Sequence, residues 1–305
     1  MTMSLESPGR GPWVCERCGK SVPAGPVVPS RADKGLAHGQ CYACDDATRW
    51  RRAEPLTPVE QYGEFYVKRD DAYERAGVRG GKVRTCWRLA QGAVGLVTAG
   101  SRSSPQVNIV AHIARELGVP CRVHTPQGEL SPEVADAAAC GAEVVQHPAG
   151  YNSVITARAR DDAASLGWTL IPFGMECEEA VRATASQADL PPGVRRVIVP
   201  VGSGMTLAGI LTGLARHASR TPVVGVSVGA DPTARLQRWA PDYPGLEIVP
   251  PSSDYHAPAP SRVSIGGADL VLDPHYEAKA AAWLGPRLEP GDLLWVVGIR
   301  RTAEG

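Results

Sequence analysis

The chemistry that this 305-residue sequence could perform begins with one lysine, Lys82, in the run GGKVRT at 80–85. A lysine amine can form an imine with an aldehyde, and it is reactive near neutral pH where its surroundings lower its pKa. A lone lysine is usually just solvated. The rest of a pocket must therefore come from another part of the chain.

A glycine-rich segment, VGSGMTLAG at 201–209, lies about 120 residues further along. A loop of small residues that leads into a helix can hold a phosphate through backbone N–H groups and the helix dipole. Pyridoxal 5′-phosphate (PLP) carries an aldehyde at one end and a phosphate at the other, so Lys82 and this loop together predict a PLP pocket. The residues expected to hold the cofactor here are Gly202, Ser203, Gly204, Met205 and Thr206.

The elements that must position these residues alternate between strands and helices from about residue 63 onward. Apolar stretches predict buried strands at 94–98, 121–124, 143–146, 169–171, 196–201, 223–228, 270–272 and 293–297. Ala-rich segments with helical spacing predict helices at 107–117, 131–140, 153–166, 207–217 and 275–284. Ser131 as N-cap and Pro132 at the first helical position mark one helix start. The alternation predicts an α/β fold with a mostly parallel sheet between helices, and a loop or lid at 241–262.

Four patches of the sequence carry a resemblance to a known family. They are YVKRDD at 66–71 leading to GGKVR at 80–84, TAG at 98–100 with the serines after it, GSGMTLAG at 202–209, and LDPHYEAK at 272–279. From about residue 62 to 297 the chain resembles the fold-type II, tryptophan-synthase-β-like PLP enzymes. Within them it is most similar to the branch of aminocyclopropane-carboxylate deaminase and D-cysteine desulfhydrase. The resemblance implies two lobes with mostly parallel, twisted sheets.

The resemblance also implies roles for single residues. Lys82 would carry the cofactor as a Schiff base and, once freed, would move protons at the substrate Cα. Ser101, Ser103 and Ser104 precede a helix and would bind the substrate carboxylate, which suits a helix N-terminus. The cofactor ring would act as the electron sink. Tyr276 resembles a family tyrosine and is a candidate acid or base, with simple packing as its alternative.

The sequence departs from the family pattern at two positions. Pro105 stands where the family has an asparagine that touches the ring hydroxyl of the cofactor, so Gln106 or Asn108 is expected to substitute. Ala268, with Asp269 beside it, stands where the deaminase branch has an acidic residue near the ring nitrogen. Protonation of that nitrogen governs how well a carbanion is stabilised, so the ring-opening deaminase reaction is not inherited with the fold.

Two further expectations concern charged and polar residues of the same domain. Arg300 and Arg301 stand where relatives have a glycine-rich turn, and they could face a larger anionic substrate. His112 lies on an apolar helix face, and we expect it to be a core histidine and not a ligand.

Residues 1–56 differ from the rest of the chain in being rich in proline, glycine, cysteine and charge. Two Cys-x-x-Cys pairs with 22 residues between them match a four-thiolate, tetrahedral zinc site. The predicted ligands are Cys15, Cys18, Cys41 and Cys44. We therefore predict a zinc ribbon over 1–56 and a PLP-binding catalytic domain over 57–305.

A basic segment with Arg49, Trp50, Arg51 and Arg52 follows the second cysteine pair. The module resembles the small zinc ribbons of phage and bacterial DNA-associated proteins. Its arginines could contact nucleic acid while the tryptophan stacks on a base. The alternative is a structural zinc staple that mediates packing or dimerisation.

The overall composition argues against several classes of protein. With 32 basic and 32 acidic residues, the chain has no net field to attract nucleic acid or an anionic membrane. Its apolar runs are too short to span a bilayer, and residues 1–13 lack the apolar core of a secretory signal. The other four cysteines are scattered. This pattern indicates a reducing, cytoplasmic location and not a disulfide framework.

Together these features predict a PLP-dependent lyase or deaminase that acts through Lys82 at the Cα or Cβ of an amino acid or amino-acid-like substrate. The family resemblance also allows a homodimer. If the ribbon binds DNA, the reaction could instead be decarboxylation of an amino-acid group on a DNA base, as in viral thymidine hypermodification. A third alternative is a non-catalytic zinc-ribbon protein that binds nucleic acid. The presence of both Lys82 and an intact glycine loop argues against that alternative.

Overall fold

The computed structural model describes residues 13–14, 21–22, 55–148, 151–229, 231–251, 254 and 257–300. The chain divides into two compact units, Met1–Pro55 and Leu56–Gly305. In the first unit the described elements are the short strands β1 (Trp13–Val14) and β2 (Ser21–Val22), which pair antiparallel. All the other described elements belong to the second unit.

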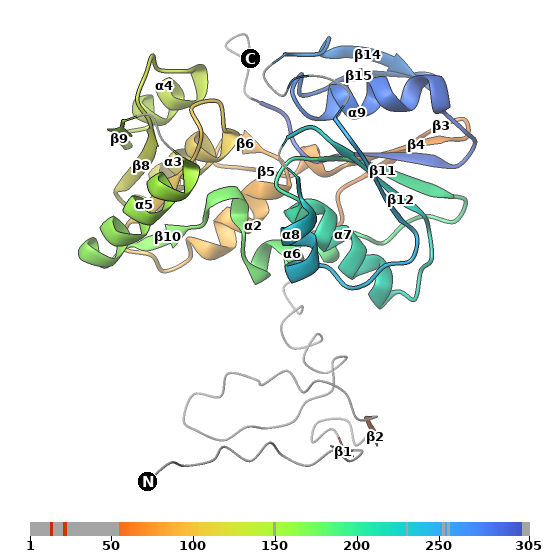
Figure 1. Ribbon diagram of the computed structural model, residues 1–305, viewed down its shortest axis with the longest axis horizontal. Coiled ribbons are helices and arrows are strands. Elements are labelled where there is room, and N and C mark those ends of the chain that lie inside the picture. The colour runs from red at the N-terminus through yellow and green to blue at the C-terminus, as the bar shows by residue number, and fades with distance from the viewer. Residues whose placement is uncertain are drawn as a thin grey trace. The chain divides into compact units, whose positions relative to one another are not determined.

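The smaller lobe of the second unit is built on a parallel sheet with the strand order β10-β7-β8-β9 (Figure 1). Its strands are β7 (Leu96–Ala99), β8 (Cys121–Pro126), β9 (Glu143–His147) and β10 (Thr169–Ile171). Helix α5 (Asn152–Leu166) covers one face through Ile155, Ala159 and Ala163. Helices α3 (Pro105–Leu117) and α4 (Pro132–Ala139) belong to the core cluster on the other face.

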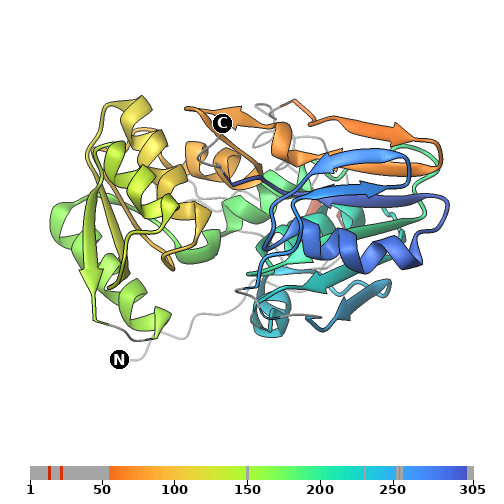
Figure 2. The same ribbon diagram turned by 90° about the horizontal axis from the view of Figure 1, so that it is seen from above.

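The larger lobe is built on a sheet with the strand order β13-β12-β11-β16-β4-β3, in which all neighbours are parallel except β3 and β4. Its strands are β3 (Val59–Tyr62), β4 (Phe65–Arg69), β11 (Arg196–Val201), β12 (Val223–Ser227), β13 (Leu246–Val249) and β16 (Asp292–Val296). Seen from above, the two lobes lie side by side (Figure 2).

Both faces of the larger sheet are covered. Helix α9 (Glu277–Leu284) and the hairpin β14 (Arg262–Ile265)–β15 (Ala268–Val271) form the core on one side. The core on the other side contains α2 (Gly81–Leu89), α6 (Glu178–Ala185), α7 (Met205–Arg216) and α8 (Thr233–Trp239). Successive side chains alternate between the two cores, with Ile198 in one and Val197 and Val199 in the other. Strands buried on both faces are therefore apolar throughout, as the sequence pattern indicated.

Short elements complete the second unit. They are the 3-10 turns η1 (Asp70–Ala72), η2 (Phe173–Met175) and η3 (Gly285–Arg287) and the antiparallel pair β5 (Glu74–Arg75) and β6 (Val78–Arg79). Among the helices of the described residues, none has both the length and the apolar character needed to cross a bilayer.

The predicted alternation of strands and helices is confirmed, including the start of α4. The Ser131 hydroxyl accepts a hydrogen bond from the N–H of Val134 at 3.3 Å, and Pro132 occupies the first turn. Two predictions were wrong in part. The predicted loop at 241–262 contains β13, which adds an edge strand beside β12. The predicted buried strand at 270–272 belongs to the antiparallel β14–β15 hairpin, and Val271 there is 51% exposed.

Candidate functional site

A cavity of about 750 Å³ lies between the two lobes. Most of its wall comes from five segments: the turn into α2, the segment from the end of β7 into α3, the loop between β11 and α7, the start of α9, and the residues after β16. Three of these segments follow the carboxyl ends of parallel strands, which is where open α/β sheets bind their ligands. The volume is typical of a site for a small organic molecule.

Lys82 lies in the first turn of α2 and lines the cavity. The turn before it is held close to the end of β16, because the N–H of Gly81 donates to the carbonyl of Val297 at 2.9 Å. Gly80 has φ 115°, and a Cβ there would lie 2.9 Å from the Cα of Gly298, so a side chain is excluded. Burial lowers the pKa of the Lys82 amine; the carboxyl groups of Glu277 and Asp273 oppose this shift, and the Arg300 cation adds to it. Lys82 is therefore suited to act as a neutral amine.

The glycine-rich loop forms another part of the wall. Gly202, Ser203, Gly204 and Thr206 line the cavity, whereas Met205 is 3% exposed and packs in the core. Gly204 has φ 87° and begins α7 with no side-chain cap, as judged within the described residues. The first N–H groups of α7 are therefore available to an anion.

Sequence reasoning missed a cation beside this loop. Arg235 of α8 lines the cavity, and its Nη1 lies 3.5 Å from the carbonyl oxygen of Ser203. Its Nε donates to Glu176 at 2.8 Å, which fixes the guanidinium. The segment 233–239 holds two arginines, Arg235 and Arg238, and no pattern in the sequence singles out Arg235.

The smaller lobe contributes Ser101, Ser104, Pro105 and Asn108 to the wall. The hydroxyl of Ser104 caps α3, since it accepts the N–H of Gln106 at 3.3 Å. Ser103 does not line the cavity. The start of α3 thus presents two of the three predicted serines.

The structure distinguishes the two residues expected to replace the family asparagine. The Nε2 of Gln106 donates to Thr98 Oγ1 at 2.9 Å and to the carbonyl of Pro172 at 2.7 Å, and Gln106 does not line the cavity. Asn108 does line it, is 4% exposed, and has an Oδ1 with no hydrogen-bond partner among the described residues. Asn108 is therefore the amide that the site offers.

The carboxyl group that lines the cavity does not come from the position that alignment with the family indicated. Ala268 packs in the core under α9, and Asp269 bonds the hydroxyl of Ser264 at 2.5 Å, so neither lines the cavity. Glu277 does, next to Tyr276 in the sequence. Its Oε1 accepts the N–H groups of Val297 at 3.1 Å and Gly298 at 3.2 Å.

Burial and the neighbouring Asp273 carboxylate raise the pKa of Glu277 to about 8. A carboxyl group that keeps its proton near neutral pH can donate a hydrogen bond to a ligand. Tyr276 lines the same side of the cavity, and its ring covers Gly202, where a Cβ would lie 2.7 Å from Cε1.

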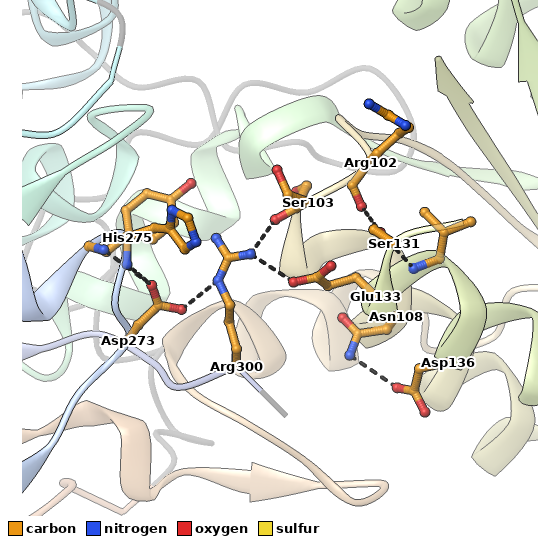
Figure 3. Close-up of polar contacts among 12 residues, drawn as sticks. Arg102, Ser103, Asn108, Ser131, Glu133, Asp136, Asp273, His275 and Arg300 are labelled. Carbon is orange, nitrogen blue, oxygen red and sulfur yellow. Dashed lines mark hydrogen bonds and ion pairs between the residues drawn. The ribbon is translucent and has the colours of Figure 1, made fainter. Parts of the chain in front are cut away.

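Arg300 connects the two lobes at the edge of the cavity (Figure 3). Its Nε donates to Asp273 at 2.8 Å, and its Nη1 donates to the carbonyl of Ser103 and to Glu133, each at 2.7 Å. Two carboxylates thus already surround this one cation. Arg300 lines the cavity and its Nη2 has no hydrogen-bond partner among the described residues, so contact with an anionic substrate stays a prediction. Arg301 lies outside the described residues.

The predicted zinc ribbon also lies outside the described residues. This applies to Cys15, Cys18, Cys41 and Cys44 and to the basic segment with Arg49, Trp50, Arg51 and Arg52. Zinc binding and contact with nucleic acid therefore stay predictions.

Comparison with known proteins identifies the class to which this cavity belongs. Residues 48–258 match the family described as pyridoxal-phosphate dependent enzyme. The chain belongs to this family. The solved structure of a homologue of 1-aminocyclopropane-1-carboxylate (ACC) deaminase has a TM-score of 0.66 at 23% identity, over 81% of this chain and 90% of that chain. This PLP-dependent enzyme thus has the fold-type II architecture that the sequence predicted.

Two curated relatives of this PLP-dependent enzyme are, by name, a dehydratase and a deaminase. L-threonine dehydratase IlvA of Corynebacterium glutamicum is 29% identical over 219 residues, which cover 66% of this chain but only 48% of that enzyme. A Thermotoga maritima protein provisionally named 1-aminocyclopropane-1-carboxylate deaminase is 27% identical over 263 residues, which cover 72% of this chain and 83% of that protein.

The residues of the cavity fit PLP. Lys82 supplies an amine with a lowered pKa, and the start of α7 supplies N–H groups that no side chain caps within the described chain. Asn108 supplies a buried amide oxygen without a partner in the same part of the chain, and Glu277 supplies a carboxyl group that is protonated near neutral pH. These donors and acceptors match the aldehyde, phosphate and ring heteroatoms of the cofactor.

Proposed function

We propose that this protein is a PLP-dependent lyase or deaminase that acts at the Cα or Cβ of an amino acid or amino-acid-like substrate. The observation that carries the proposal is that Lys82 and the uncapped start of α7 line one cavity. PLP carries both an aldehyde and a phosphate group, so its binding site needs an amine and an anion-binding site that face the same cavity.

Lys82 would hold the cofactor through a Schiff base, while the backbone N–H groups of 202–206 and the hydroxyl of Thr206 would hold its phosphate. When bound, PLP supplies the electron sink that makes a bond to Cα labile. Glu277 would share its proton with the ring nitrogen, and Asn108 would contact the ring edge. These two residues take over the functions that the family pattern had led us to seek at Ala268 and Pro105.

The substrate carboxylate would bind at the start of α3, beside Ser101 and Ser104. Once released, the Lys82 amine would accept or donate a proton at Cα, which is a suitable task because its pKa is lowered. Tyr276 is a candidate for a second proton transfer, since it lines the cavity next to Glu277.

Decarboxylation of an amino-acid group attached to a DNA base remains the alternative for the substrate. It would use the same Lys82 and the same serines, with the predicted ribbon holding DNA. Elimination of ammonia from free amino acids and loss of carbon dioxide from modified DNA have different products, so parallel assays on both substrates separate the two reactions.

The first test is an absorbance spectrum of the purified protein before and after borohydride, followed by mass spectrometry of the reduced peptide. We expect a band near the visible edge that borohydride removes, with the reduced cofactor on Lys82. Lys68 is an internal control: burial lowers the pKa of its amine to about 8, but it does not line the cavity. Label on Lys68, or a colourless protein that takes up no PLP, would refute the proposal and leave the predicted ribbon as the functional module.

A further inference from the structure

A second group of reactive side chains lies in the smaller lobe, between α3 and α4. It consists of His112 on α3, Asp136 on α4 and Cys140 at the C-cap of α4. Asp136 and Cys140 are four residues apart, so both point from the same face of the helix. One ligand atom from each of the three residues lies within 4.8 Å of the other two. Three different metal-ligand types therefore converge on one point.

The contacts of the imidazole suit a metal ligand. The Nε2 of His112 lies 2.8 Å from Oδ2 of Asp136, and its Nδ1 lies 3.2 Å from the carbonyl oxygen of Ala76. Histidines that bind metals commonly donate their second ring N–H to a backbone carbonyl, which fixes the tautomer and directs the free nitrogen to the ion. The Nη2 of Arg115 lies 3.2 Å from the same Nδ1, and metal binding would break this contact, because a guanidinium only donates and the metal-binding tautomer carries its proton on Nδ1.

Asn108 holds the carboxylate of Asp136 in place. It precedes His112 by one helical turn, and its Nδ2 lies 3.1 Å from the same Oδ2 of Asp136 (Figure 3). Its Oδ1 is buried without a partner among the described residues. That oxygen belongs to the cofactor cavity, so Asn108 contributes to this group through Nδ2, which orients the Asp136 carboxylate as an outer partner of a metal ligand does.

We propose that His112, Asp136 and Cys140 form a binding site for a divalent transition metal of the zinc type, with a water as fourth ligand. One thiolate, one imidazole and oxygen donors are a ligand set that zinc accepts in tetrahedral sites. The carboxylate and the thiolate together balance the two positive charges of the ion. Binding breaks the S–H bond of Cys140, forms the metal–sulfur bond, and releases the proton to solvent.

The position of the site is compatible with exchange of the ion. His112 is buried, whereas Asp136 and Cys140 are half-buried, so the ion can enter from the solvent side. The proposal does not depend on the proposed function. It also differs from the sequence expectation, which treated His112 as a core histidine.

The test is metal analysis of the full-length protein after equilibration with zinc, on the wild type and on Cys140→Ser, Asp136→Asn and His112→Gln. Cys177→Ser is the matched control, because Cys177 is another half-buried cysteine but caps α6 in a different part of the fold. We expect the wild type and the control to bind one more equivalent of zinc than the three variants, or to bind it at least about tenfold more tightly. The predicted ribbon site contributes equally to every sample, so it cancels in the comparison.

Cobalt substitution gives a second readout, because each thiolate bound to cobalt adds intensity to the ligand-to-metal band in the near ultraviolet. We expect Cys140→Ser to remove the contribution of one thiolate and Cys177→Ser to remove none. If His112→Gln fails to fold, the conservative Cys140→Ser and Asp136→Asn variants decide the matter. Equal zinc content, affinity and cobalt spectrum in the wild type and these variants would overturn the proposal and leave His112 and Asp136 as a structural ion pair.

Discussion

The guanidinium of Arg300 bonds the carboxylate of Glu133 at 2.7 Å, although the two residues are 167 positions apart and belong to different lobes. Arg300 follows the last strand of the larger sheet, and Glu133 lies in the first turn of α4 in the smaller lobe. The same arginine bonds Asp273 and the carbonyl of Ser103. One side chain therefore holds the start of α9, the segment before α3 and the start of α4 together at the edge of the cavity.

The Arg300–Glu133 pair predicts a measurable loss of stability when its charge is removed. Glu133→Gln keeps the shape but replaces a charge-assisted hydrogen bond by a neutral one. We expect the free energy of unfolding to fall by about 2 kcal/mol, because both side chains are 10% exposed. Urea denaturation measures this difference. Glu129→Gln, an exposed neighbour before α4, is the control and should change the value by less than about 0.5 kcal/mol. Equal losses in both variants would contradict a connection between the lobes.

The raised pKa of Glu277 predicts a pH dependence of stability in protein without added cofactor. The folded state keeps this carboxyl protonated up to about pH 8, whereas the unfolded chain ionises it above its ordinary value of 4.5. Between these values the folded state binds more protons, so this group makes stability fall as pH rises. The glutamine of Glu277→Gln does not titrate in this pH range, so the variant lacks this pH dependence.

The measurement for Glu277 is urea denaturation of wild type and variant at several pH values. We expect Glu277→Gln to gain stability relative to wild type by about 1 kcal/mol per pH unit between the two pKa values. Glu129→Gln should follow the wild type at every pH. Parallel profiles of Glu277→Gln and wild type would show that Glu277 is already ionised in the folded protein.

The sequence predicted the parts of the site that local patterns encode. The Gly-rich segment joins β11 to α7, and Ser131 caps α4, because short-range rules for strands and helix starts decide both. The acid of the cavity was not predicted, since Glu277 reaches the cavity through the docking of α9 against the end of β16. The choice between Gln106 and Asn108 depends on how α3 is rotated in its packing, which no local pattern reveals. The role of Arg300 depends on a contact between distant segments.

The different environments of Asn108 and Gln106 predict opposite phenotypes for two alanine variants. Asn108→Ala removes an amide that lines the cavity, so we expect weaker PLP binding, by about tenfold, and a shifted cofactor absorbance. Gln106→Ala leaves the Thr98 hydroxyl and the Pro172 carbonyl without their partner, so we expect a loss of stability of about 1–3 kcal/mol. Cofactor titration and urea denaturation of both variants check this. If Gln106→Ala had the larger effect on PLP affinity at equal stability, the assignment of Asn108 would be wrong.

The close approach of Gly202 and Tyr276 predicts a rescue. A Cβ at Gly202 would lie 2.7 Å from Cε1 of the tyrosine, while the φ of Gly202 is not in the left-handed region, so only the ring opposes a side chain there. Gly202→Ala must therefore displace the ring or the loop. We expect PLP affinity to fall by at least about tenfold, which corresponds to an interaction energy that is ordinary for two residues in contact.

Tyr276→Ala removes the obstacle, so the double variant should bind PLP more tightly than Gly202→Ala alone. Gly204→Ala is the matched control within the loop, because its φ of 87° opposes any side chain whether or not the tyrosine is present. Adding Tyr276→Ala to that variant should therefore restore nothing. A cofactor titration of the wild type and the five variants completes the two cycles. If the effects of Gly202→Ala and Tyr276→Ala on PLP affinity were additive, the tyrosine ring would not oppose a side chain at position 202. Tyr276 would then have no part in shaping the cofactor site.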